Sequence, residues 1–192
     1  MTELDDTTLI QQFKRGDTAA FNELVNRWQG KIHRFAYGFF ADSDEASDIT
    51  QKTFIKAYQK MDMLDDPGNF SPWIYRVANN LCLDELKRAG RRKSSPLEAW
   101  VEQSIEGEQL SPVDELEASE LGKIIQKALL TLPDEQRVVV ILKEYEGLKF
   151  REIAEILEEP ENTVKSRLYY GLKALRRVLT KWNIPKHYLN YD

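Results

Sequence analysis

Apolar residues recur at helical spacing along most of this chain, and no segment shows the strict alternation typical of a half-buried strand. The clearest stripe is formed by Phe21, Leu24, Val25 and Trp28, and it continues beyond Gly30. A stripe of this kind lets a helix bury one face while its other face stays in water. The sequence therefore predicts an all-α protein.

Capping residues divide the pattern into separate helices. Asp17 and Thr18 stand before the first stripe, and Ser43 is expected to cap the next helix. Ser71 followed by Pro72 is a typical helix start, because the first turn tolerates proline. The helix after Ser43 is predicted to turn six residues inward: Ala46, Ile49, Thr53, Phe54, Ala57 and Tyr58. These signals predict a first helical domain over residues 1–93.

The helical period weakens over residues 94–119, where Pro96, Gly107 and Pro112 interrupt it. From residue 94 to Gly122 there are eight acidic residues and no Lys or Arg. Like charges repel and keep a segment extended. We therefore expect residues 94–119 to form a flexible acidic linker.

A second helical domain is predicted over residues 120–182. Its helical pattern begins near Leu116, restarts at Pro133 and ends near Trp182. Asn183 then stops the pattern, which leaves residues 183–192 as a tail.

The net charge of −5 hides an uneven distribution. Six basic residues stand against two acidic ones from Arg76 to Lys93, and six against one from Glu161 to Lys181. Two basic segments separated by an acidic linker suggest two nucleic-acid contact surfaces. The alternative is that each cluster is the solvated face of an ordinary helix.

A helix-turn-helix is predicted near the end of the second domain. Residues 150–157 have the pattern of a short helix, which residues 158–160 interrupt. The next helix is expected to bury Val164, Leu168, Leu172, Leu175 and Leu179. Its other face would present polar and basic side chains to the major groove of DNA. An ordinary helical hairpin with a lysine-rich exterior is the alternative.

Several function classes lack the residues they need. Cys82 is the single cysteine, and His33 and His187 are the two histidines. A disulfide, a cysteine-based zinc cluster and imidazole acid–base chemistry are therefore not expected, and Cys82 is predicted to be a buried thiol. We find no nucleophile–base pair or glycine-rich phosphate loop, so no catalytic site, metal or cofactor is predicted.

No apolar run is long enough to span a membrane. The acidic segment Met1–Asp6 lacks the apolar core of a signal sequence. We therefore expect a cytoplasmic protein without direct membrane insertion.

Four motifs resemble those of the extracytoplasmic function (ECF) sigma factors, members of the sigma-70 family. DITQKTFIKAY (residues 48–58) and FSPWIYRVANNLCLD (residues 70–84) resemble region 2, and LPDEQR (residues 132–137) and TVKSRL (residues 163–168) resemble region 4. Their order and spacing cover nearly the whole chain. The resemblance implies a factor that binds core RNA polymerase, recognises the −35 and −10 promoter elements and promotes strand opening.

The resemblance also assigns roles to matching positions. Asp48 and Gln51 would dock on the β′ clamp helices of the polymerase, with Ile55 exposed nearby for an apolar contact. The second domain would meet the β flap. The alternative to the contact with the clamp helices is a solvated polar stripe.

The helix that starts at Ser71 resembles the family's reader of the −10 element. The residues assigned to that element are Trp73, Arg76, Asn79, Asn80, Lys87, Arg88, Arg91 and Arg92. An asparagine can both donate to and accept from the edge of an extruded base, and the cations would hold phosphates. For Trp73 a core anchor is favoured over a wedge that stacks on a base. The alternative for Asn80 is an ordinary helix-surface residue or a satisfied buried amide.

The second helix of the helix-turn-helix would read the −35 element in duplex DNA. Its assigned residues are Asn162, Thr163, Lys165, Ser166, Arg167, Tyr169, Tyr170 and Lys173. Lys165 and Ser166 can hydrogen-bond to bases, while the tyrosines can pack on thymine methyl groups or sugars.

This chain departs from the family pattern at a few positions. Lys52 stands where Glu is common, and Lys149 where Ser or Thr often caps a helix. Glu158 and Glu159 replace the usual glycine and apolar residue of the turn, and Asn162 replaces a frequent glycine. The turn change leaves the tilt of the recognition helix open.

Two other functions are compatible with parts of the pattern. A helix-turn-helix regulator that binds duplex DNA without polymerase would leave the amino-terminal motifs unexplained. A helical scaffold would show no salt-sensitive contact with nucleic acid. The family resemblance implies an anti-sigma factor as an additional partner.

Overall fold

The computed structural model describes residues 4–88, 90 and 120–182, and within them every regular element is helical. The all-α prediction is confirmed there. The expected acidic linker, the tail, the start near Leu116 and the predicted DNA contacts Arg91 and Arg92 lie outside the described residues.

The amino-terminal part consists of four α-helices and two short 3₁₀ turns. In chain order these are α1 (Asp6–Lys14), α2 (Thr18–Phe40), α3 (Ser43–Lys60), η1 (Met61–Met63), η2 (Pro67–Asn69) and α4 (Phe70–Arg88). Helix α1 was not among the predicted elements. Its cap is Asp5, whose carboxylate accepts a hydrogen bond from the Thr8 backbone N–H at 2.8 Å.

Two helix starts, those of α3 and α4, differ from the predicted ones by a single residue. Asp17 caps α2, as expected, by accepting from the Ala19 N–H. Asp42 and not Ser43 caps α3, because the Asp42 carboxylate reaches the Glu45 N–H at 2.9 Å. Helix α4 begins at Phe70 and not at Ser71, because η2 leads directly into its first turn.

Aromatic rings fill the core of the amino-terminal part. Trp28 packs edge-on against Phe70 and Tyr75, with ring centroids 5.4 and 5.9 Å apart. Tyr58, predicted to face inward, is 50% exposed and lies at the edge of the core against Phe13 and Phe21. Both of those ring contacts are 5.2 Å, so the face of α3 that bears Tyr58 is only partly covered.

The carboxy-terminal part contains α5 (Glu120–Leu130), α6 (Asp134–Val140), the π-helical turn η4 (Ile141–Tyr145), α7 (Phe150–Leu157) and α8 (Glu161–Lys181). Helices α7 and α8 form the predicted helix-turn-helix. Helix α8 ends at Lys181, with Trp182 as its last cap.

The prediction that Leu172 belongs to the buried face of α8 is wrong. Leu172 is 41% exposed, and Gly171 is buried in its place. An α-helix repeats its face after seven residues, so Gly171 lies in line with Val164 and faces α6. A Cβ at Gly171 would lie 3.0 Å from the Val140 side chain, which explains the absence of a side chain there.

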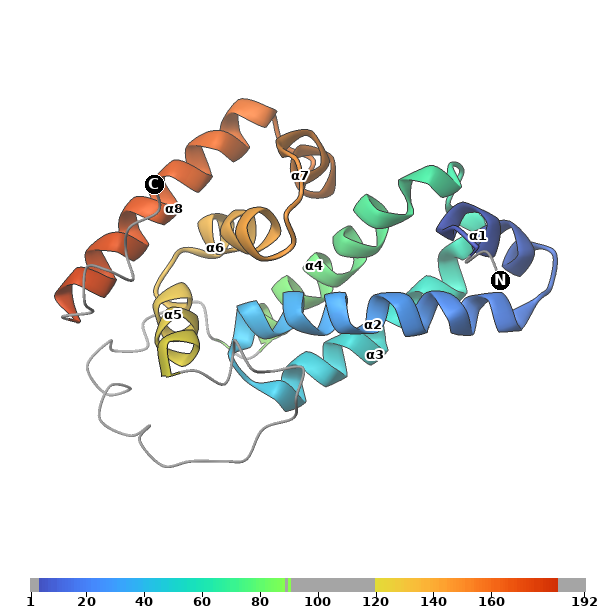
Figure 1. Cartoon of the computed structure of the whole chain (residues 1–192), viewed down its shortest axis with the longest axis horizontal. Coiled ribbons are helices and arrows are strands. Elements are labelled where there is room, and N and C mark those ends of the chain that lie inside the picture. Colours follow the sequence, from blue (N-terminus) through green and yellow to red (C-terminus); the bar gives the residue numbers. More distant parts are fainter. Residues whose placement is uncertain (1–3, 89, 91–119, 183–192) are drawn as a thin grey trace.

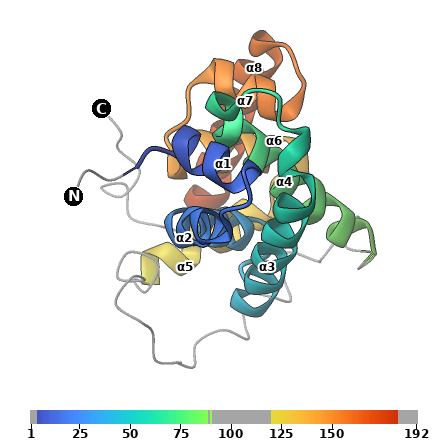
Figure 2. The same cartoon turned by 90° about the vertical axis from the view of Figure 1, so that its right-hand side faces the viewer.

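The two parts lie against each other and share a continuous apolar core (Figures 1 and 2). Helices α2 and α4 contact α5, η4 and α7, while α8 lies along the outer edge of the carboxy-terminal part (Figure 1). At Gly38 the approach is close, because a Cβ there would lie 2.8 Å from Ile141 Cδ1. The close packing of α2 against η4 was not predicted.

Arg137 fixes the corner where α2, α5 and α6 meet. Its guanidinium donates to the carbonyls of Leu129, Leu130 and Leu132, at and just beyond the end of α5. It also donates to the Phe39 carbonyl of α2 at 3.1 Å. Burial lowers the pKa of Arg137, and the nearby carboxylate of Asp134 opposes that shift. A planar cation with five donors suits this cluster of carbonyls.

Candidate functional site

The residues predicted to bind polymerase share one exposed face of α3. Asp48, Gln51 and Ile55 are all exposed, and Ile55 is 57% exposed although its side chain is apolar. Their spacing of three and four residues places them in one row along the helix. Tyr58 extends this row by three residues, and its exposure was missed because its spacing also fits the inner stripe.

Lys52, one of the departures from the family pattern, alters the charge of this row. Its ammonium group donates to Asp48 at 2.5 Å and lies 3.8 Å from Glu85 on α4. The carboxylate of Asp48 is therefore partly neutralised within the chain.

Helix α4 presents the two predicted base-reading asparagines differently. Asn80 is exposed, whereas Asn79 is only 6% exposed and its Oδ1 has no hydrogen-bond partner among the described residues. Trp73 is half-buried and packs against Phe70, with ring centroids 6.0 Å apart. Asn80 is thus the accessible asparagine of the two, and Trp73 packs at the edge of the core.

The cations of α4 fall into two groups. Lys87 and Arg88 are exposed at the end of the helix, where Arg88 lies 3.3 Å from Glu85. Arg76 lies in the middle of the helix and reaches across to α7, as described below. The first group is exposed, whereas the Arg76 side chain is 34% exposed and is engaged with α7.

Helix α8 exposes most of its predicted DNA contacts on one side. Six of them are exposed, namely Asn162, Lys165, Ser166, Tyr169, Tyr170 and, further on, Lys173, while Thr163 is half-buried. The two tyrosine rings meet edge-on at 5.4 Å, with the Lys173 ammonium 5.8 Å from the Tyr169 ring. Lys165 pairs with Glu161 at 2.7 Å. Large exposed rings beside cations suit a surface that contacts bases and phosphates.

Arg167 departs from its neighbours because it points back toward the turn. Its guanidinium lies 3.0 Å from Glu159 and 3.4 Å from Glu135. Together with Asn79 it lines a cavity of about 180 Å³ between α4, α6 and the turn. The side chain of Arg167, a predicted −35 contact, is 21% exposed and is engaged by these two acids in this arrangement.

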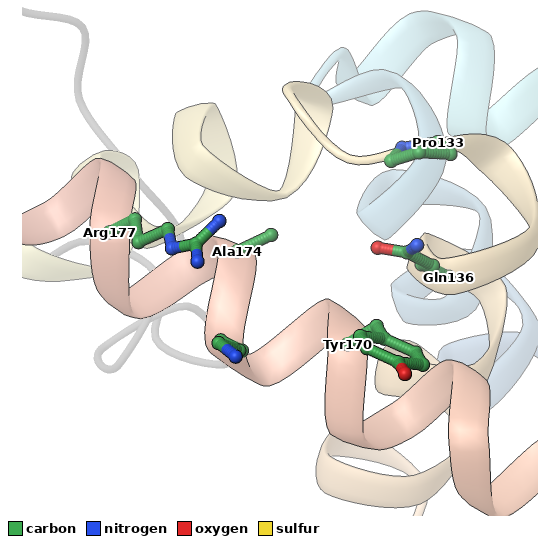
Figure 3. A pocket seen from close by; sticks show the side chains of 6 residues that line it. Pro133, Gln136, Tyr170, Ala174 and Arg177 are labelled. Carbon is green, nitrogen blue, oxygen red and sulfur yellow. The ribbon is translucent and has the colours of Figure 1, made fainter.

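A hollow of about 390 Å³ opens between α8 and the start of α6 (Figure 3). Tyr170, Ala174 and Arg177 lie on its α8 side and face Pro133 and Gln136 (Figure 3). Sequence reasoning gave no site role to Gln136 or Arg177. Arg177 stands four residues after Lys173 and seven after Tyr170, so helical spacing alone would have placed it on this face.

An ion pair between a buried carboxylate and a partly exposed guanidinium links the two parts of the chain. Glu146 accepts two hydrogen bonds from Arg34, at 3.0 and 3.1 Å, and one from the Tyr75 hydroxyl at 2.6 Å. The Glu146 side chain is only 2% exposed. Burial raises the pKa of Tyr75 far above its ordinary value, and the adjacent negative charge of Glu146 adds to this shift.

Two further features bear on function. Cys82 is buried, as predicted, and burial raises the pKa of its thiol. Among the described residues, no helix combines the length and apolar character needed to cross a bilayer.

Helix α7 begins without a Ser or Thr cap, because Lys149 stands at that position. The carboxylate of Glu152 accepts a hydrogen bond from the Lys149 N–H at 2.7 Å and so satisfies one backbone donor at the start of α7.

Comparison with known families matches both parts of the chain. Models of sigma-70 region 2 and sigma-70 region 4 match residues 24–92 and 122–175. The ECF RNA polymerase sigma factor SigW of Bacillus subtilis is 36% identical over 178 residues, which cover 88% of this chain and 94% of that protein. The RNA polymerase sigma-H factor of Pseudomonas aeruginosa is 31% identical and covers 93% of this chain and 96% of its own length.

Solved structures share the fold at lower identity. CnrH in complex with the cytosolic domain of CnrY has a TM-score of 0.68 and 23% identity, covering 92% of this chain and 97% of that one. The sigma factor RpoE of Bartonella quintana, in complex with the anti-sigma factor NepR, has a TM-score of 0.66 and 24% identity, covering 83% and 96%.

Proposed function

The chain belongs to the ECF group of the sigma-70 family of RNA polymerase sigma factors, and we propose that its two helical parts divide promoter recognition between paired and separated strands. The amino-terminal part would bind core RNA polymerase and the −10 element, and the carboxy-terminal part the −35 element. The observation that carries this division is the placement of three exposed surfaces on α3, α4 and α8. Each surface has the chemistry that its role requires.

The surface of α3 supports the polymerase contact. An exposed isoleucine and a half-exposed tyrosine in line with Asp48 and Gln51 provide an apolar centre with a polar rim. Such a row suits the side of another helix, and we assign it to the β′ clamp helices. The β flap would contact the carboxy-terminal part.

Asn80 and the cations at the end of α4 support the −10 contact. Asn80 is exposed and can pair with the edge of a base that has left the stack. Lys87 and Arg88 lie two turns further on and would hold phosphates. Strand opening would then be driven by capture of extruded bases, without consumption of a nucleotide.

The exposed side of α8 supports the −35 contact. Lys165, Ser166 and the two tyrosines lie near the amino-terminal end of α8, where a recognition helix meets base edges. Lys173 and Arg177 beside the hollow would hold the adjoining phosphates.

Matches over both parts favour a sigma factor over a regulator that would use the helix-turn-helix alone. We further propose that the protein acts in the cytoplasm with RNA polymerase and has no catalytic activity of its own. An anti-sigma factor is proposed as a partner that competes with the polymerase for the α3 surface.

Run-off transcription with core RNA polymerase and a randomised promoter pool tests this function. We expect the full chain to associate with core polymerase and to enrich promoters with defined −10 and −35 elements. Absence of both association and transcripts would contradict the proposal.

Two substitutions separate the roles. Asn80→Ala should reduce open-complex formation while polymerase binding is retained, and Asp84→Ala, an exposed change one turn further along α4, serves as the control. Lys165→Ala should weaken promoters by about 1–3 kcal/mol in a manner that depends on the −35 sequence. Equal weakening of all sequences would assign Lys165 to phosphate and not to a base.

A further inference from the structure

The turn of the helix-turn-helix carries two neighbouring acids, Glu158 and Glu159, where the family pattern has a glycine and an apolar residue. Glu158 ends α7 with a left-handed backbone, φ 55°, a conformation that favours glycine. Glu159 follows it, where an apolar residue would help to join the two helices. A non-glycine residue at a left-handed position has to be held there by its surroundings. The contacts of both side chains show what holds them.

Glu158 binds the central arginine of the −10 reader. Its carboxylate lies 3.2 Å from Arg76 Nη1, while Arg76 Nη2 donates to the Glu155 carbonyl at 2.6 Å. These contacts join α4 to the end of α7. The hydrogen-bonded residues Arg76 and Glu155 are 79 positions apart in the chain. Arg76 is thereby tied to the carboxy-terminal part while its side chain stays partly exposed.

Glu159 binds an arginine of the −35 reader in the same way. Its carboxylate accepts from Arg167 Nη2 at 3.0 Å, and the side chain of Arg167 is turned into the small cavity beside α4. The adjacent acids therefore neutralise one arginine from each DNA-binding surface. A carboxylate offers an arginine the same pair of acceptor oxygens that a phosphate does.

We propose that Glu158 and Glu159 form an internal phosphate mimic that holds Arg76 and Arg167 until promoter DNA replaces it. The inference rests on the proposed function, since it assumes that both arginines bind DNA phosphates. While the mimic is in place the two parts stay packed and the free chain has low affinity for DNA. Promoter phosphates compete for the same guanidinium groups and release the packing.

The arrangement at Arg76 is suited to release. Its Nε is buried and has no acceptor among the described residues, so one of its donors is unsatisfied in the packed state. Arg76 and Glu158 are both partly exposed, which leaves the pair open to competition from solvent and salt. A contact of this kind can be exchanged for a phosphate.

The test uses the full chain without polymerase and a short DNA duplex of random sequence. Loss of an exposed ion pair changes an equilibrium constant by a factor of about 1.4 to 5, so Glu158→Gln with Glu159→Gln should tighten DNA binding by about 2- to 25-fold. Each arginine that gains a phosphate should also steepen the dependence of log K on log salt by about 0.9.

Glu155→Gln is the matched control, because it removes one negative charge at an exposed position one turn before Glu158. The backbone carbonyl of residue 155, which accepts from Arg76, remains in this variant. It should leave affinity and salt slope close to those of the unaltered chain. Glu158→Gly gives a second route, because it relieves the left-handed backbone and should raise the melting temperature while it still releases Arg76.

Arg76→Gln and Arg167→Gln, introduced into the double glutamine variant, should remove the gain in DNA binding. The proposal is overturned if the double variant binds DNA as weakly as the unaltered chain. It is also overturned if Glu155→Gln gives an equal gain per charge or if the gain survives loss of both arginines. Association of the unaltered chain with core polymerase, measured on the same preparation, reports separately on the proposed function.

Discussion

Replacement of Glu146 by glutamine tests whether the two parts are packed together in solution. In the structure its carboxylate accepts three hydrogen bonds, two from Arg34 and one from the Tyr75 hydroxyl. Glutamine has nearly the same shape but lacks the charge, and its amide NH₂ meets donors where the carboxylate offered acceptors. The substitution therefore alters the interaction while the volume stays the same.

The two partners of Glu146 contribute unequally to the expected loss. Arg34 is 42% exposed and can regain water, so its share resembles that of a surface pair, at most about 1 kcal/mol. Tyr75 is 2% exposed and cannot, so its unpaired hydroxyl costs about 1–3 kcal/mol. Together they predict a decrease of about 1–4 kcal/mol in the free energy of unfolding.

Urea unfolding followed by tryptophan fluorescence and by circular dichroism measures this decrease. Tyr75→Phe is the companion variant, because it removes the hydroxyl and leaves Glu146 with Arg34. Since the two groups touch, the combined variant should deviate from additivity by about 0.5–3 kcal/mol. If Glu146→Gln changes the unfolding free energy by less than about 0.5 kcal/mol, or the two changes simply add, the contact does not form in solution.

Three other predictions follow from buried polar groups. Arg137→Lys should lower the free energy of unfolding by about 2–4 kcal/mol in urea titrations, because a single ammonium group cannot reach the carbonyls of both Leu129 and Phe39; an unchanged midpoint would contradict this role. Stability should fall as the pH rises above 10.0, the ordinary value for tyrosine, because the pKa of Tyr75 is raised in the folded chain and the unfolded chain loses that proton first; Tyr75→Phe should make the alkaline slope shallower, and an identical slope would refute the assignment. Cys82 should react with iodoacetamide at neutral pH far more slowly in the folded chain than in urea, because burial raises the pKa of its thiol; equal rates would show that α4 opens readily.

Features set by neighbours in the chain could be predicted from the sequence. The buried stripe of α2, its cap at Asp17 and the helix-turn-helix of α7 and α8 depend on residues within one or two turns of each other. The exposure of Asn80 and of the tyrosines on α8 follows from the same spacing. The predicted site residues could therefore be placed on faces of helices, although no pattern showed which of them would be engaged elsewhere.

Errors arose where two residues fitted the same local rule. Leu172 and Gly171 are both compatible with the helical period, and the close approach of Val140 decides between them. Tyr58 fits the inner stripe of α3, but the core next to it is already filled by Phe13 and Phe21. Packing against another helix settled both cases, and periodicity carries no information about that neighbour.

The helical class, most helix limits and the chemistry of the three exposed surfaces could be read from the order of residues, because periodicity, caps and charge act over a few residues. The shared core of the two parts and the pairing of Arg76 and Arg167 with Glu158 and Glu159 became visible in the folded chain alone. The interface depends on groups as distant as Arg34 and Glu146, 112 residues apart. Such pairs are fixed by how two folded surfaces meet, since their free energy depends on burial and geometry that neither segment has alone.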